Sequence, residues 1–289
     1  MQAHVPGPRR SLLFVPASNP RAIEKARGLA CDGVVLDLED SVVEEAKPAA
    51  RQAAIQAIGA GFGDREVILR CNGLDTPWGE ADLRAAATAG PHGVLIPKVR
   101  GVDDILACDR LLAAAPAQTR LWAMIETAEG VLNLEAIAAA SKGGRLEGLV
   151  LGPNDLSAEL RLRPSPDRAA LRPVLSRIIV AARAFGLAAL GGAFNAFEDD
   201  DAFERECGED AAFGFDGKTL IHPRQIAIAN RVFSPSPEET AWARAVVDAF
   251  AAPDAQGRGA IRLRGRMIER LHLKEAQRVL AFSGRAAGP

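Results

Sequence analysis

The sequence predicts an α/β fold, a (β/α)8 TIM barrel with a C-terminal helical extension. Eight short apolar runs follow one another along the chain, separated by alanine-rich segments of high helical propensity. Most of these runs start roughly 25 to 40 residues apart, which is the spacing that βα units require. Most of the runs are continuously apolar, as is typical of parallel strands buried on both faces.

The predicted strands cover residues 11–15, 34–38, 67–71, 94–97, 121–125, 149–151, 187–190 and 215–219. Helices are expected between them, among others over residues 46–58, 80–89, 103–115, 132–140 and 171–185. Eight such units favour a closed barrel over an open doubly wound sheet. The chain length of 289 residues fits, because a barrel of this kind takes about 250 residues and leaves room for an extension.

The pattern changes after the turn Ile221-His222-Pro223, so we expect two domains. Residues 1–233 are predicted to form the TIM-barrel catalytic domain, and residues 234–289 a C-terminal extension or lid. Within the extension, the run Pro235-Ser-Pro-Glu predicts the start of a helix that continues to about Ala251. Residues 263–282 are expected to form a short turn and a last helix.

Charge and hydropathy exclude several classes of partner. The chain has 35 Lys and Arg against 37 Asp and Glu, a net charge of -2, so we expect it to bind neither nucleic acid nor a membrane surface. No run of about 20 apolar residues suggests a membrane span. The four cysteines, Cys31, Cys71, Cys108 and Cys207, lie far apart without a CxxC motif. We therefore expect free thiols and a cytoplasmic location.

Two acidic residues stand at the ends of neighbouring predicted strands. Glu126 follows the fifth strand directly, and Asp155 follows the sixth after a short Gly-Pro-Asn turn. The carboxyl ends of parallel strands converge on one mouth of a barrel. Carboxylate oxygens are the ligands that Mg²⁺ prefers, with other positions left for water and substrate. The sequence therefore predicts a Mg²⁺ site at Glu126 and Asp155, with Mn²⁺ as a possible substitute.

Other strand ends add charge to the same mouth: Arg70, Lys98, Lys218 and the acids Asp37, Glu39 and Asp40. Such a set suits an anionic substrate bound to a metal. Two alternatives stay open at this point. Arg70 could contact the substrate or pair with Asp37 or Glu39, and a lysine Schiff base on Lys98 or Lys218 is possible.

Six motifs occur in order along the chain: RSLLFVP at 10–16, VLDLEDS at 35–41, LRCNGLDTPWG at 69–79, IPKV at 96–99, IETAEG at 125–130 and GFDGKTLIHPRQ at 214–225. Together they resemble the citrate lyase β-subunit-like family. This family includes malyl-CoA, methylmalyl-CoA and citramalyl-CoA lyases and belongs to the wider HpcH/HpaI aldolase group. The resemblance covers nearly the whole chain.

The resemblance implies roles for the matching residues. Glu126 and Asp155 would ligate Mg²⁺, and Arg70 would bind an oxygen of the oxoacid or thioester, which suits a guanidinium fork. Contacts to coenzyme A are implied for Phe14, Lys25 and Ile221-His222-Pro223.

Near the C-terminus, relatives carry an Asp that acts as base in a neighbouring subunit's mouth. The matching motif here is GRMIE at 265–269, so the acid is Glu269, one methylene longer. A second departure is Asn19, where relatives often have an arginine near the phosphates of coenzyme A.

The expected function is a Mg²⁺-dependent acyl-CoA lyase. It would cleave a 3-hydroxyacyl-CoA, such as malyl-CoA or citramalyl-CoA, into a 2-oxoacid and acetyl- or propionyl-CoA. A malyl-CoA thioesterase at the same site is the first alternative, which the longer Glu269 also allows. An aldolase for CoA-free oxoacids and a non-catalytic or carrier-dependent subunit of a lyase complex are the others. Self-association, as a trimer or hexamer, is implied by the resemblance.

Overall fold

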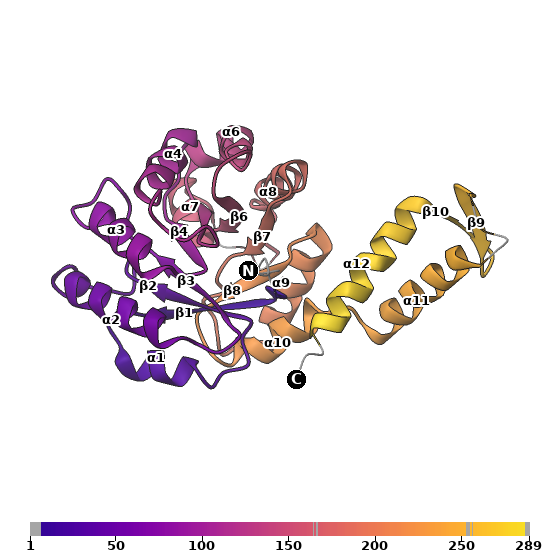
Figure 1. The fold of residues 1–289 in the computed structure, drawn as a ribbon, viewed down its shortest axis with the longest axis horizontal. Helices are drawn as coiled ribbons and strands as arrows, with labels where there is room; N and C mark the ends of the chain where they lie inside the picture. Colours follow the sequence, from indigo (N-terminus) through magenta and orange to yellow (C-terminus); the bar gives the residue numbers. More distant parts are fainter. Residues whose placement is uncertain (1–6, 164, 166, 253–254, 256, 287–289) are drawn as a thin grey trace.

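The computed structural model describes residues 7–163, 165, 167–252, 255 and 257–286. Eight parallel strands form a closed barrel in which β8 pairs with β1 (Figure 1). All eight predicted strands are present, with ends shifted by at most three residues. They are β1 (Ser11–Pro16), β2 (Gly33–Asp37), β3 (Glu66–Arg70), β4 (Gly93–Ile96), β5 (Arg120–Ile125), β6 (Leu146–Leu151), β7 (Ala188–Gly191) and β8 (Gly217–Leu220).

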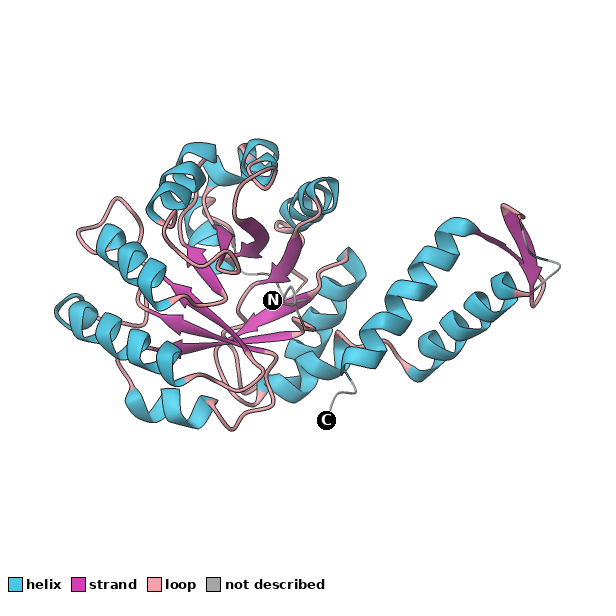
Figure 2. Ribbon diagram, in the orientation of Figure 1, coloured by secondary structure: helices cyan, strands magenta, loops and turns pink. Residues whose placement is uncertain are grey.

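Helices surround the barrel and cover the outer faces of its strands (Figure 2). The predicted helix over residues 132–140 is two short helices that meet at Asn133. The barrel helices are α1 (Pro20–Ala26), η1 (Glu44–Ala46, a 3₁₀ turn), α2 (Lys47–Ala60), α3 (Gly79–Ala89), α4 (Val102–Leu111), α5 (Ala128–Leu132), α6 (Leu134–Ala139), α7 (Pro153–Glu159), α8 (Arg172–Phe185), α9 (Asp200–Phe213) and α10 (Gln225–Val232).

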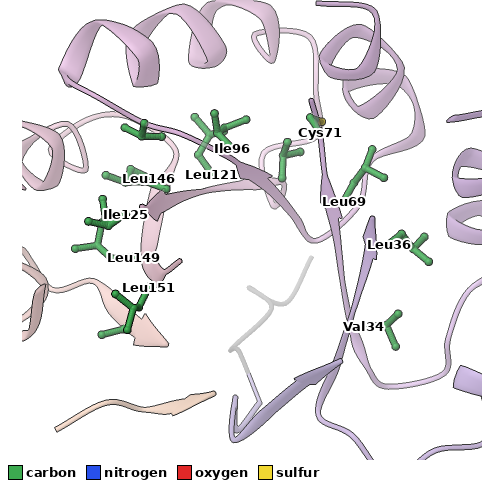
Figure 3. Packing of buried hydrophobic residues seen from close by; sticks show 14 of the residues in the cluster. Val34, Leu36, Leu69, Cys71, Ile96, Leu121, Ile125, Leu146, Leu149 and Leu151 are labelled. Atoms are coloured by element: carbon green, nitrogen blue, oxygen red, sulfur yellow. The ribbon is translucent and has the colours of Figure 1, made fainter. Parts of the chain in front are cut away.

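Two hydrophobic clusters fill the two faces of the strands. Val34 and Leu36 of β2 belong to the larger cluster, between strands and helices, and lie on the same side of their strand (Figure 3). Val35, between them, belongs to the smaller cluster inside the barrel. This alternation follows from the period of two in a strand, and burial of both faces explains the continuous apolar runs in the sequence.

Trp122 of β5 fills much of the barrel interior and is fully buried. Glycines on both neighbouring strands make room for its ring. A Cβ at Gly148 would lie 2.3 Å from the ring, and one at Gly93 would lie 3.0 Å from it. Arg9, which precedes β1, lies at the amino-terminal end of the barrel, with its guanidinium 4.6 Å from the centroid of the Trp122 ring.

The C-terminal extension projects from the barrel as a pair of helices tipped by a hairpin (Figure 1). It consists of α11 (Pro237–Ala251), β9 (Ala260–Leu263), β10 (Arg266–Glu269) and α12 (Arg270–Ala286). The helix α11 begins as predicted, with Ser236 accepting a hydrogen bond from the Glu239 amide in a capping box. The extension has its own hydrophobic cluster, which includes Val246, Phe250 and Ile268.

One expectation for the extension is wrong. Residues 260–269 form an antiparallel hairpin rather than a turn leading into a helix. Arg264 and Gly265 connect its strands, with φ of 46° and 81°. Positive φ at both central residues is the conformation of a tight hairpin turn, and it ends any helical pattern there.

The cysteines and the helices of the described residues agree with the sequence analysis. Cys31, Cys71, Cys108 and Cys207 are all free and buried. Among the described helices, none combines the length and the apolar character needed to cross a bilayer.

Candidate functional site

A cavity of about 330 Å³ opens at the carboxyl ends of the strands. Five of the predicted site residues line it: Phe14, Arg70, Glu126, Asp155 and Ile221. The other lining residues are Pro16, Asp37, Asp40, Ser41, Met124, Gly152, Pro153, Asn154 and Ala193. Residues from distant parts of the sequence therefore meet at the mouth, because the strands that carry them converge there.

Glu126, directly after β5, is a deeply buried acid of this cavity, with 1% of its surface exposed. Its Oε1 accepts a hydrogen bond of 2.7 Å from the main-chain amide of Lys98. Burial raises the pKa of Glu126 to about 8; the Lys98 amide opposes the rise, and the charges of Glu39 and Asp155 add to it. A carboxyl group in this state favours a proton or a cation as its partner.

Gly152 allows the Glu126 carboxylate to approach the loop that carries Asp155. A Cβ at Gly152 would lie 2.4 Å from Glu126 Oε2, closer than real atoms permit. Pro153 begins α7, and Asp155 stands in the first turn of that helix, half-buried, at the cavity wall. Both carboxylates thus face the same space.

The donor set fits Mg²⁺ or Mn²⁺. Hard oxygen ligands on two side chains suit such a cation, which usually keeps water or substrate at its other positions. In the described part of the chain, no group of three or more His, Cys, Asp or Glu residues is arranged to enclose an ion. A pair such as Glu126 and Asp155 would leave positions on a bound ion for water or substrate.

Arg70 ends β3 and contacts three carboxylates. Its Nε and Nη2 donate to the two oxygens of Asp37 at 2.6 and 2.7 Å. Its Nη1 donates to Asp40 at 3.1 Å and lies 2.9 Å from Glu39 Oε2. Burial opposes the charge of Arg70, but the ion pairs outweigh burial and raise its pKa. The pairing with Asp37 and Glu39 that the sequence left open is thus present, and the same side chain lines the cavity.

Phe14 and Glu39 complete the surroundings of Arg70. The guanidinium lies 4.7 Å from the Phe14 ring centroid, a cation–π contact. Burial raises the pKa of Glu39 to about 7; Arg70 opposes this rise, whereas the charge of Asp40 adds to it. Two carboxyl groups at this mouth, Glu39 and Glu126, therefore titrate near neutral pH.

Several predicted residues do not line the cavity. Lys25 is exposed in the last turn of α1. The ring of His222 stacks on Phe197, with centroids 4.7 Å apart, and Pro223 is half-buried beside it. Glu269 ends β10 in the extension, and its amide donates to His272 Nδ1 at 3.0 Å.

Asn19 has a visible structural contact. Its side chain caps α1 by accepting a hydrogen bond of 3.1 Å from the Ala22 amide. This contact explains an Asn at that position without reference to a ligand.

The placement of Lys218 at the mouth is wrong. Its side chain is fully buried, with Nζ 2.6 Å from Asp210 and 2.9 Å from Glu206, both in α9. It therefore points outward from β8 into the helical layer, as alternate strand residues do. A Schiff base on Lys218 has no route to a substrate in the cavity.

Sequence reasoning missed Lys47, which holds the loop after β2 in place. Its buried Nζ donates to the carbonyls of Leu38 and Glu39, both at 3.0 Å, and to Asn72 Oδ1 at 2.6 Å. The Trp78 ring lies 5.2 Å from the same nitrogen. These contacts give Asn72 and Trp78 of the LRCNGLDTPWG motif a structural role. A lone lysine before an alanine-rich helix gives no signal of such burial.

Comparison with known proteins agrees with the motifs. The model of the family HpcH/HpaI aldolase/citrate lyase matches residues 10–223. A (3S)-malyl-CoA thioesterase of Cereibacter sphaeroides (strain KD131) is 45% identical over 280 residues, covering 96% of both chains. The citrate lyase subunit beta of Escherichia coli (strain K12) is 34% identical, covering 94% of this chain and 92% of the relative. An L-malyl-CoA/beta-methylmalyl-CoA lyase of C. sphaeroides (strain ATCC 17025) is 34% identical, covering 93% of both.

Solved structures show the same likeness. CitE from Mycobacterium tuberculosis, in complex with magnesium, acetoacetate and coenzyme A, superposes with a TM-score of 0.79. The two chains are 33% identical, and the match covers 98% of this chain and 100% of the other. RipC from Yersinia pestis matches with a TM-score of 0.68 at 32% identity, over 80% of this chain and 97% of its own. The chain therefore belongs to the HpcH/HpaI aldolase/citrate lyase family.

Proposed function

We propose that this chain hydrolyses a short 3-hydroxyacyl-CoA thioester that ends in a carboxylate, such as (3S)-malyl-CoA. The observation that carries the proposal is the 45% identity to a (3S)-malyl-CoA thioesterase along 96% of both chains. The relatives named as lyases are 34% identical. Hydrolysis, the first alternative from the sequence, is thus better supported than the lyase reaction expected there.

The metal site supports an anionic substrate of this kind. Glu126 and Asp155 would hold Mg²⁺, and Mn²⁺ could replace it. When bound, the ion supplies a Lewis acid that polarises a substrate oxygen. The CitE structure that matches this chain contains magnesium and coenzyme A, which supports the same ligands here.

We propose that Arg70 binds a carboxylate or carbonyl oxygen of the substrate. Asp37 holds one edge of the guanidinium through two hydrogen bonds, whereas Nη1 is shared with Asp40, whose side chain is 57% exposed. The Asp40 carboxylate can turn into solvent, so we propose that a substrate oxygen replaces it at Nη1, where Glu39 Oε2 lies 2.9 Å away. The orientation that Asp37 imposes on Arg70 would persist through that exchange.

The cavity is large enough for the acyl group but not for coenzyme A. A volume of about 330 Å³ lies at the small end of ligand pockets, which hold about 300–1,000 Å³. We propose that the acyl group enters the cavity past Phe14 and Ile221 and that coenzyme A stays on the rim. Lys25, His222 and Pro223 remain proposed contacts for it.

The proposed base, Glu269, lies far along the chain from the other site residues. Glu269 lies in the projecting extension and does not line the cavity of its own chain. We propose that it reaches the mouth of a second copy, in a trimer or hexamer. Exposed Met267 and Leu271, at 70% and 60%, offer apolar surface on the hairpin and the adjoining helix for that contact. Glu269 would take the proton of the water that adds to the thioester carbonyl, and the thiolate of coenzyme A would leave.

A product assay tests the proposal. Purified protein, Mg²⁺ and (3S)-malyl-CoA should give malate and free coenzyme A in equal amounts, and chelation should stop the reaction. Chromatography of the products also detects glyoxylate and acetyl-CoA, which would establish the lyase instead. The lyase stays the second candidate because relatives named as lyases match at least 92% of both chains. A purified chain that turns over no CoA thioester would indicate a carrier-dependent subunit.

A further inference from the structure

Lys98 has an unusual backbone conformation at the mouth of the barrel. Its φ is 52°, in the left-handed region that residues with side chains rarely adopt. Among the described residues other than glycine, only Arg161, Arg168 and Arg264 share a positive φ. Lys98 follows β4 after Pro97 and donates its main-chain N–H to Glu126. Strained backbone at a functional site is a reason to ask what the strain achieves.

The left-handed conformation aims the Lys98 amide at a carboxylate. This N–H donates to Glu126 Oε1 at 2.7 Å, at the short end of the range for N–H···O hydrogen bonds. The other oxygen, Oε2, lies at Gly152, where the loop to Asp155 begins. One oxygen of Glu126 is thus held by the protein, and the other lies against Gly152, three residues before Asp155.

Residues of the IETAEG motif hold the Lys98 turn in this shape. Thr127 Oγ1 donates to the carbonyl of Val99 at 3.0 Å, and Val99 itself is fully buried. Gly130 lets the chains approach, since a Cβ there would lie 2.3 Å from the same carbonyl oxygen. The residues that follow Glu126 therefore fix the turn that binds Glu126. This contact explains why the motif has a Thr at position 127 and a Gly at position 130.

The side chain of Lys98 has a different contact from its amide. Its Nζ lies 3.4 Å from Glu39 Oε1, and the side chain is 46% exposed. The ammonium group is therefore on the rim, away from the hydrogen bond to Glu126. Main chain and side chain can be separated by substitution.

We propose that Lys98 is a positioning residue for the metal ligand Glu126. Its left-handed main chain fixes Oε1 and leaves Oε2 directed toward Asp155 for a divalent cation. The inference rests on the metal site of the proposed function. It adds that the affinity for the ion depends on the backbone conformation at residue 98 and little on the lysine side chain.

Binding of Mn²⁺ to the purified protein, followed by the electron paramagnetic resonance of the free ion, tests this directly. Lys98→Val should weaken binding about 10-fold or more, because a β-branched residue resists positive φ and withdraws the amide. Lys98→Gly and Lys98→Asn, which accept positive φ, should bind within about 2-fold of the original protein. The affinity of Lys98→Ala for Mn²⁺ should lie between those of Lys98→Gly and Lys98→Val. Circular dichroism shows whether each variant folds, and Lys98→Ala replaces Lys98→Val in the test if the latter does not.

Arg264→Val is the matched control. It places the same strain at φ 46° in the hairpin of the extension, so it should leave Mn²⁺ affinity unchanged. Equal affinity in Lys98→Val and the original protein would overturn the inference, as would equal losses in Lys98→Gly and Lys98→Val. If the original protein binds no Mn²⁺, the metal site itself fails, and the role of Lys98 with it. The two failures are therefore distinguishable.

Discussion

The two ends of the barrel use charge in opposite ways. At the floor, Arg9 donates to both oxygens of Glu66, at 2.6 and 2.7 Å, and to Glu147 at 2.7 Å. At the mouth, buried Glu126 receives one main-chain N–H and carries a pKa raised to about 8 by burial. The floor satisfies its charges within the protein, whereas the mouth leaves an acid short of partners.

This difference separates stability from function on one scaffold. In barrels of this type, the ends of the strands at the mouth carry the chemistry, and the opposite end serves stability. An acid that is buried without a cation destabilises the fold but is ready to bind one. We therefore expect substitutions of acids at the two ends to differ in sign for stability and in size for activity.

The largest effect should come from Glu126→Gln. Loss of the charged ligand should reduce Mg²⁺-dependent turnover of malyl-CoA by more than about 100-fold. Loss of a residue that only hydrogen-bonds to a metal ligand already costs about 10- to 100-fold in affinity or activity. Glu147→Gln, the same change at the floor, should stay within about 2-fold. Steady-state kinetics at saturating Mg²⁺ compare them, and similar losses in both would remove the distinction between the ends.

The pH dependence of metal binding should follow Glu126. A cation competes with the proton on this carboxyl group, whose pKa without metal is about 8. Affinity for Mn²⁺ should therefore rise about 10-fold per pH unit up to about pH 8 and level off above it. Calorimetric titrations between pH 6 and 9 measure this slope. A flat profile would show that Glu126 is already ionised at pH 6.

At the floor, Glu66→Gln should lower the free energy of unfolding by about 2–3 kcal/mol. It weakens two charged hydrogen bonds of Arg9, whose side chain is 10% exposed, although Glu147 remains as a partner. Urea denaturation measures the loss, and Mn²⁺ affinity should not change. Altered metal affinity in this variant would mean that the floor also shapes the mouth.

Glu126→Gln should shift stability the other way in metal-free protein, by up to about 4 kcal/mol at pH 8. The folded state raises the pKa of Glu126 from 4.5 to about 8, so ionisation disfavours the fold increasingly as pH rises through that window. The gain should vanish below about pH 3.5, where the carboxyl group is protonated in folded and unfolded chains alike. Urea denaturation with chelator at both values checks it, and a variant less stable at pH 8 would contradict this sign.

The barrel was predictable because burial on both faces makes most of its strands continuous apolar runs. The hairpin of β9 and β10 was not predicted, since Ala260–Glu269 is rich in exposed arginines. Only Ile261 and Leu263 alternate there, ahead of the Arg264-Gly265 turn. Short charged strands of this kind give a weak pattern, although a two-residue turn with glycine is a signal that could have been used.

The site was predictable as far as strand ends determine it. Arg70, Glu126 and Asp155 follow different strands and line one cavity. The direction of the Lys218 side chain was not predictable, because a shift of one residue along a strand moves a side chain to the other face. Nor was the contact of Lys98 with Glu126, since it is made by the main chain and depends on a backbone angle rather than on residue type.

The most direct test is the position of an ion in crystals soaked with Mn²⁺. Anomalous scattering should show one site at the mouth, with oxygens of Glu126 and Asp155 at about 2.0–2.2 Å from the ion. An ion bound elsewhere, or Glu126 and Asp155 turned away from each other around an empty cavity, would contradict the proposed chemistry.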